Sequence, residues 1–236
     1  MKHLALFLAF ALLPTSTFAA IAFDAGAGTV DLSGTVATLS FTAATNSCII
    51  AGTELNSGQD HLVSFTWDGV GMTFIGKMQV NADWVYAYYV CGASGTHDLV
   101  STQDPETNAI RIVACSYTGV NPSMSYPTTD TFAWNTTVGT SISTSTAPKT
   151  AGSWLVTFGY DDDTLGEPTA STNVTSRAGA TGSDNFHCGD TNGIASGSTT
   201  QTWTSVGSDH LGIIQVSISP PASAVANIRP FFYWWW

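Results

Sequence analysis

The sequence has few charged residues, and basic residues are the scarcest of them. Lys and Arg number 6 among 236 residues against 17 Asp and Glu, which gives a formal net charge of −11. So acidic a chain offers little attraction to the phosphates of nucleic acid or to an anionic membrane surface. The sequence therefore predicts that neither is a direct partner.

Several chemical signatures are missing from the sequence. It has no CxxC pair, no GxSxG nucleophile elbow and no phosphate-binding glycine loop, so zinc binding, α/β-hydrolase chemistry and nucleotide binding are not expected. No segment beyond the N-terminus keeps an apolar period of 3.6 residues with helix caps. The sequence predicts no cofactor and no helical architecture.

The N-terminus, residues 1–19, is predicted to be a signal peptide. Lys2 precedes the apolar run Leu4–Leu13, and small residues allow cleavage after Ala19. The run is too short to span a bilayer as a helix, although a membrane anchor is the alternative interpretation. The sequence thus predicts export to the extracellular space or the cell surface.

Residues 20–220 are predicted to form one all-β domain, a single antiparallel β-sandwich of about 10–12 strands. Thr, Ser and Gly are abundant, and turn signals recur roughly every 8–12 residues, as is typical of sandwiches. Residues 121–140 are expected to be a long surface connection. The predicted strands are Ile21–Ala25, Val36–Ala43, Cys48–Leu55, the hairpin Val63–Lys77, Trp84–Cys91, Ala109–Tyr117, Ser153–Tyr160, Asn173–Arg177, Gly182–Cys188, Thr199–Trp203 and Leu211–Ser219. Gly95–Val100 is predicted to be a turn with a short strand, and Thr140–Thr146 either a strand edge or a linker.

The hairpin Val63–Lys77 has the clearest local pattern. Asp68-Gly69 is a two-residue turn of the type that needs positive φ, and so short a turn fixes the strand register. The register predicts three apolar cross-strand pairs on one face: Val63 with Phe74, Phe65 with Met72, and Trp67 with Val70. This face is predicted to form the inner wall of the sandwich.

Four cysteines are present: Cys48, Cys91, Cys115 and Cys188. An even count in an exported chain predicts one or two disulfides. Three complete pairings exist, and the sequence does not choose among them.

The order of several short motifs resembles a family of uncharacterised β-sandwich proteins from environmental bacterial and phage sequences. The motifs are Ala22–Ala25 (AFDA), Thr66–Thr73 (TWDGVGMT), Tyr117–Val120 (YTGV) and Ser208–Pro220 (SDHLGIIQVSISP). The resemblance implies a jelly-roll-like sandwich and a secreted surface protein or a virion-associated one. It carries over no catalytic residue.

Trp84, Tyr86 and Tyr88 are the candidate ligand-binding residues. They share one face of a strand at intervals of about 6.6 Å, from the strand rise. Aromatic rings at that spacing can stack on successive sugar rings. The alternative is that they belong to the core, because aromatic side chains dominate buried area.

An acidic segment supplies the candidate metal ligands Asp161, Asp163 and Glu167. Carboxylates in a flexible loop suit Ca²⁺, although the spacing does not match an EF-hand loop. A solvated acidic turn is the alternative.

Two other clusters suggest chemistry only weakly. The segment DNFHCGD places Asp184, His187, Cys188 and Asp190 together, which offers metal ligands or a nucleophile. A disulfide at Cys188 in a polar loop is the alternative. A glycoside hydrolase would need two paired carboxylates, and the three glutamates, Glu54, Glu106 and Glu167, show no such pairing.

Residues 221–236 are predicted to be a proline- and aromatic-rich tail ending in Phe231–Trp236 (FFYWWW). Six aromatic side chains left in water would be unfavourable. We therefore expect this segment to self-associate, to dock on a partner subunit or to contact a membrane interface. A truncated or shifted reading frame is the alternative origin.

The sequence as a whole predicts a non-enzymatic, secreted surface or virion-associated structural or adhesion protein. Its partner would be a glycan or another surface or virion protein. A carbohydrate-binding module of the concanavalin or jelly-roll type is the alternative, and a glycoside hydrolase ranks third.

Overall fold

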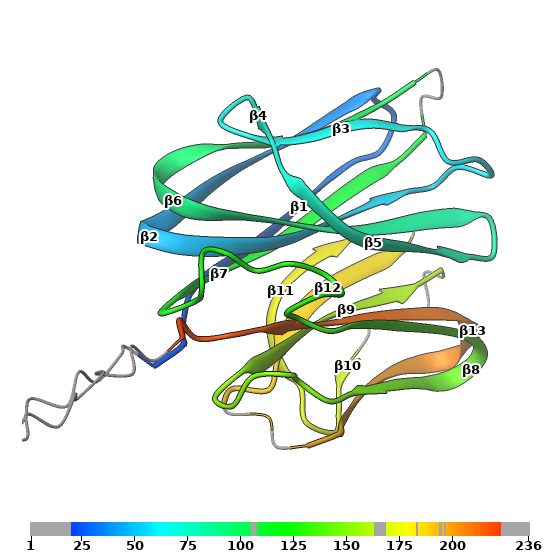
Figure 1. Ribbon diagram of the computed structural model, residues 1–236. Helices are drawn as coiled ribbons and strands as arrows, with labels where there is room; N and C mark the ends of the chain where they lie inside the picture. The colour runs from blue at the N-terminus through cyan, green and yellow to red at the C-terminus, as the bar shows by residue number, and fades with distance from the viewer. Residues whose placement is uncertain are drawn as a thin grey trace, which may run out of the picture.

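In the computed structural model, the chain forms two antiparallel β-sheets packed face to face (Figure 1). The structure describes residues 20–104, 108–162, 169–182, 184–193, 195 and 197–222. The predicted all-β antiparallel sandwich is confirmed, with thirteen strands in the described part. No helix in these ranges is long and apolar enough to cross a membrane.

The larger sheet has seven strands in the order β1-β7-β2-β6-β3-β4, and β5 also pairs with β6. Its strands are β1 (Ala22–Asp31), β2 (Val36–Leu55), β3 (Leu62–Trp67), β4 (Val70–Gly71), β5 (Thr73–Val80), β6 (Asp83–Gln103) and β7 (Ile110–Thr118). β5 pairs with the first half of β6 and β3 with its second half. Because β6 bends between them, the sheet curls and brings β3 opposite β5, as Figure 1 shows.

The long strands β2 and β6 replace four shorter strands predicted from the sequence. Val36–Ala43 and Cys48–Leu55 join into β2, and the predicted strand pair Trp84–Cys91 and Gly95–Val100 joins into β6. The breaks suggested by the sequence are bends within strands. Gly92 and Gly95 have φ of 79° and 84°, a region that glycine enters without steric cost, so β6 turns there and continues pairing with β2.

The curl gives the molecule two main cores. One lies between the two sheets and contains side chains such as Ile50, Val113 and Phe158. The other lies inside the curl and is made only by residues of the larger sheet and its connections, among them Phe41 and Leu99. Alternate residues of β7 supply both cores, because successive side chains of a strand point to opposite faces.

The hairpin prediction is correct at its tip and wrong beyond it. Asp68 and Gly69 have φ of 51° and 72°, and Trp67 pairs with Val70 as predicted. Past the tip, however, β5 leaves β3 and pairs with β6, so Val63 does not face Phe74. Of the predicted apolar face, Phe65, Trp67 and Met72 are buried, whereas Val63, Val70 and Phe74 are exposed.

The hairpin also does not form the inner wall between the sheets, as the sequence had suggested. Its buried side chains belong to the core inside the curl. Three of the six side chains predicted to be buried are buried, and a second layer made by the same sheet covers them as a separate sheet would.

The smaller sheet has six strands in the order β10-β13-β9-β12-β11, with β8 also paired to β13. Its strands are β8 (Phe132–Thr146), β9 (Trp154–Asp161), β10 (Thr169–Ala170), β11 (Thr175–Thr181), β12 (Asn185–Asp190) and β13 (Thr199–Ile218). The surface connection predicted for residues 121–140 is wrong over its second part, because β8 begins at Phe132. β13 likewise joins two predicted strands into one.

Both predicted disulfides form, and the structure selects one of the three pairings. Cys48 pairs with Cys91, linking the neighbouring strands β2 and β6. Cys115 pairs with Cys188, linking β7 of one sheet to β12 of the other. The second bond therefore joins the two sheets through the core between them.

Glycines allow β1 to lie against β11 at one side of the sandwich. A Cβ added at Gly28 would lie 2.3 Å from the carbonyl oxygen of Gly179, and one at Gly26 would lie 2.8 Å from that of Arg177. Both obstacles are backbone atoms, so no side-chain rotation relieves the clash.

We expect Gly28→Ala to lower the free energy of unfolding by about 1–3 kcal/mol, because the strands must separate to admit the methyl group. Urea unfolding measures the loss. Gly71→Ala is the matched control, since nothing lies within 4 Å of a Cβ at that position. Equal losses in the two variants would show that the close approach of β1 and β11 does not limit stability.

Candidate functional site

Two of the three aromatic residues singled out from the sequence, Tyr86 and Tyr88, line an open trough at the mouth of the curl, and Trp84 lies beside Tyr86. Trp84, Tyr86 and Tyr88 lie on the face of β6 that carries the core inside the curl. Tyr86 is buried, whereas Trp84 and Tyr88 are half-buried. The residues lining the trough, which encloses about 300 Å³, are Asp60, Leu62, Phe74, Lys77, Tyr86 and Tyr88.

Strand pairing explains why these side chains converge. Phe74 and Lys77 of β5 lie opposite Tyr88 and Tyr86 of β6, so the four share one face. The ring of Tyr88 also contacts Phe65 of β3 edge to face, with centroids 5.4 Å apart. This contact joins β6 to β3 across the curl.

Trp84 and Tyr86 stack on one another next to the trough. Their rings stack at 27° with centroids 6.4 Å apart. Tyr88 continues the row and meets Phe74, which is 49% exposed, at 5.3 Å. Half-exposed aromatic rings in a row provide apolar faces against which the C–H groups of a ligand can pack.

A polar group occupies the same trough. The carboxylate of Asp60, in the connection between β2 and β3, accepts hydrogen bonds from the Lys77 ammonium and the Tyr86 hydroxyl. Lys77 also lies over the Trp84 ring, with Nζ 4.8 Å from the ring centroid. The trough thus combines apolar faces with one fixed carboxylate and one ammonium.

The ionisation of the polar groups follows from these contacts. Burial works to raise the pKa of Asp60, but hydrogen bonds from Lys77 and Tyr86 outweigh it and lower the pKa. Burial raises the pKa of Tyr86, and its bond to the Asp60 carboxylate raises it further. Asp60 is therefore an anion and Tyr86 a neutral donor at neutral pH.

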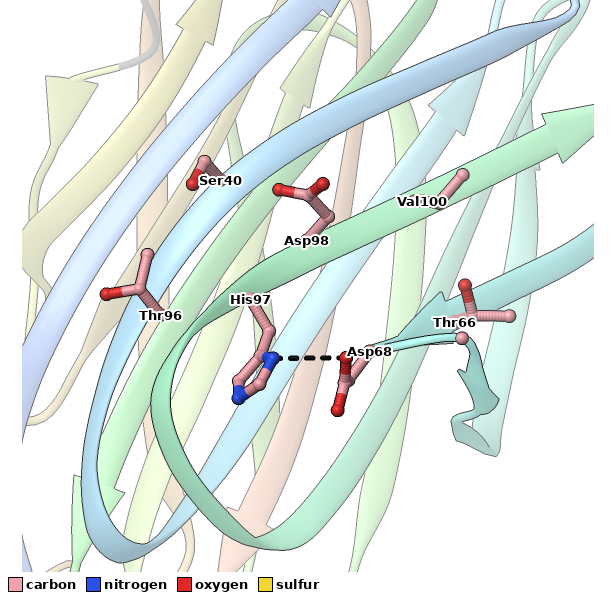
Figure 2. A pocket seen from close by; sticks show the side chains of 8 residues that line it. Ser40, Thr66, Asp68, Thr96, His97, Asp98 and Val100 are labelled. Atoms are coloured by element: carbon pink, nitrogen blue, oxygen red, sulfur yellow. Dashed lines mark ion pairs between the residues drawn. The ribbon is translucent and has the colours of Figure 1, made fainter.

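A second depression, of about 460 Å³, lies beside the Asp68-Gly69 turn. Figure 2 shows Asp68 and His97 pointing toward one another, with His97 Nδ1 3.0 Å from Asp68 Oδ1. Asp98 and Ser40 lie beside each other on neighbouring strands. No aromatic ring other than the His97 imidazole lines this depression, so it lacks the stacking surface that distinguishes the trough.

A third group of polar residues is buried at one end of the core between the sheets. Oxygens of Glu54, Asp83 and Asp184 lie within 4.8 Å of one another. Arg111, paired directly with Glu54 in the sheet register, places Nη1 2.6 Å from Glu54 Oε2 and 2.8 Å from Asp184 Oδ2. Tyr160 donates a hydrogen bond to Asp83 at 2.6 Å.

Burial dominates the ionisation of this carboxylate cluster. It raises the pKa of Glu54 to about 8, although Arg111 acts to lower it. It also raises the pKa of Asp83 to about 7, against the hydrogen bond from Tyr160. Arg111 brings one positive charge to three carboxylates, and the cluster is a closed, buried structural network rather than an open site.

Three of the predicted segments fall wholly or largely outside the described residues. Asp161 is buried at the end of β9, and Asp163 and Glu167 lie outside the described residues, so the predicted calcium site stays a prediction. Most of the tail 221–236 lies outside the described residues as well. So does the whole signal-peptide segment.

The DNFHCGD segment forms β12, and its residues go to different places. Cys188 is in a disulfide. Asp190 accepts hydrogen bonds from Arg177 and Tyr117, while Asp184 belongs to the buried carboxylate cluster. The prediction of a metal or nucleophile site is therefore wrong: Cys188 has no free thiol, Asp184 and Asp190 pair with different arginines, and His187 points to the opposite face of β12, against the Trp203 ring.

The three glutamates do not form a carboxylate pair within the described residues. Glu54 lies in the buried carboxylate cluster, away from any open groove, and Glu106 and Glu167 lie outside the described residues.

Asp60 and Lys77 were not singled out from the sequence. Lys77 is one of four basic residues in the described part of the chain. That scarcity is the one signal that could have marked it. The contact of Asp60 with Lys77 depends on the curl.

A scan against protein-family models and searches of curated proteins and of solved structures found no match.

Proposed function

We propose that this protein is a secreted, non-enzymatic adhesion protein that binds a glycan in the trough along the aromatic row Trp84, Tyr86 and Tyr88. The observation that carries the proposal is the convergence of the partly exposed rings of Tyr88 and Phe74 with one carboxylate, that of Asp60, in an open trough. Sugar rings present apolar C–H faces together with hydroxyl groups. Aromatic walls and a few fixed polar groups are the combination that binds such ligands.

The compartment supports the proposal. Two disulfides fit an oxidising environment, as expected of an extracellular protein. The net charge of −11 also disfavours nucleic acid as the ligand. A virion-associated role is compatible with the same trough, because a surface protein of a virion also binds glycans.

We expect Tyr88→Ala to weaken glycan binding by at least about tenfold, because it removes one stacking face. The test is a glycan array on the purified protein, followed by titration calorimetry on the best ligand. Trp134→Ala is the matched control: Trp134 is 52% exposed on β8 of the other sheet.

Thermal unfolding would show that the Tyr88→Ala variant remains folded, since Tyr88 also packs on Phe65 and Phe74. Trp84→Ala provides a second position in the row. If the wild-type protein bound no glycan on the array, the proposal would be overturned. Equal weakening by Trp134→Ala would place the site elsewhere.

A further inference from the structure

We infer that the trough recognises a protonated amine of its ligand, and that the glycan it binds carries free amino sugars such as glucosamine units. The inference rests on the proposed function, because it names the ligand class for the same trough. It is carried by the position of Lys77, whose ammonium group already occupies a cation-binding cage.

The cage has three walls from two parts of the chain. Asp60 supplies a carboxylate that pairs with Lys77. Lys77 Nζ lies 4.8 Å from the centroid of the Trp84 ring and 6.0 Å from that of Tyr86. A carboxylate combined with aromatic faces is the arrangement by which proteins bind ligand ammonium groups.

The walls are held in place without help from Lys77. Tyr86 is 2% exposed and donates its hydroxyl to Asp60, which fixes the carboxylate. Trp84 is stacked on Tyr86. An empty cage would therefore keep its geometry.

The Lys77 side chain, in contrast, can move out of the cage. Its side chain is 39% exposed on β5, and that of Asp60 is 37% exposed, so both are open to solvent. A lysine side chain is flexible and strongly hydrated. When a ligand ammonium replaces the lysine ammonium, the charge balance around Asp60 stays the same.

Other ligand charges fit the trough less well. A neutral sugar stacked on Trp84 would displace Lys77 and leave Asp60 without its cation. An anionic sugar would approach Asp60 in a chain of net charge −11, where long-range attraction favours cations. Among glycans, those with free amines match both the cage and the overall charge.

The inference is tested by calorimetric titration with three tetrasaccharides: a glucosamine oligomer, its fully N-acetylated form and a neutral glucan. The pH is kept low enough to protonate the amines. We expect the wild-type protein to bind the glucosamine oligomer at least about tenfold more tightly than either of the others. We also expect one binding site per chain.

Two variants separate the cage from general electrostatic attraction. Lys77→Gln empties the cage and is expected to tighten glucosamine binding about 3–10-fold, whereas Asp60→Asn should abolish the preference for free amines. Lys149→Gln and Asp98→Asn change the net charge by the same amounts away from the trough. They should leave the preference unchanged.

The outcomes separate this inference from the glycan-binding proposal. Binding of N-acetylated or neutral oligomers without preference for free amines would overturn the inference and leave glycan binding intact. Weaker binding by Lys77→Gln would make Lys77 a ligand contact and would also overturn it. Failure of all glycans to bind would overturn both.

Discussion

Raising the pH from about 4.5 to about 8 is expected to lower the free energy of unfolding markedly. Burial raises the pKa of Glu54 from 4.5 to about 8, so the folded state binds this proton more tightly than the unfolded state does. The stabilisation is complete below the unfolded pKa and is lost as the pH rises through the folded pKa. For a fully buried group, this shift corresponds to a loss on the order of 5 kcal/mol.

Asp83 acts in the same direction, because its pKa is raised to about 7 by burial. Urea unfolding at a series of pH values would measure the profile. Glu54→Gln keeps an acceptor for Arg111 but does not titrate. We therefore expect the free energy of unfolding of this variant to depend less on pH, with only the contribution of Asp83 remaining. Asp98→Asn, at an exposed position outside the carboxylate cluster, should preserve the wild-type slope.

A wild-type stability that rises over this pH range would contradict the prediction. It would mean that Arg111 holds Glu54 ionised and that the attraction between them exceeds the cost of burial.

Removing the disulfide between the sheets is expected to have the second large effect. Cys115→Ala with Cys188→Ala should lower the free energy of unfolding by about 4 kcal/mol, because the bond closes a long loop in the unfolded chain. The two cysteines are 73 residues apart and fully buried. Urea unfolding under non-reducing conditions measures the loss.

The matched control is Cys48→Ala with Cys91→Ala, whose partners are 43 residues apart. Loop length alone makes this loss smaller by about 0.5 kcal/mol. β2 and β6 also remain joined by their hydrogen bonds along most of their length, so we expect a clearly smaller effect. A larger loss in this control would show that the curl, rather than the contact between sheets, limits stability.

The sequence predicted the parts of the fold that depend on neighbouring residues. The turn at Asp68-Gly69 has the expected positive φ, and the adjacent pair Trp67–Val70 forms as predicted. The register farther along failed, because whether β5 stays with β3 depends on the competing edge of β6.

The sequence likewise predicted only part of the candidate site. The spacing of Trp84, Tyr86 and Tyr88 placed them on one face, which the alternation of a strand guarantees. It did not show that this face lines a trough. Nor did it find Asp60 and Lys77, whose positions depend on the bend in β6 and on the connection between β2 and β3.

The sequence by itself determined the all-β class, the tip of the hairpin and which strand faces are apolar, because turn chemistry and side-chain alternation act over a few residues. The tertiary structure alone decided the disulfide pairing, the buried carboxylate cluster around Arg111 and the trough. Each of these joins residues far apart in the chain. The trough in addition requires the bend of β2 and β6, by which the larger sheet encloses a second core.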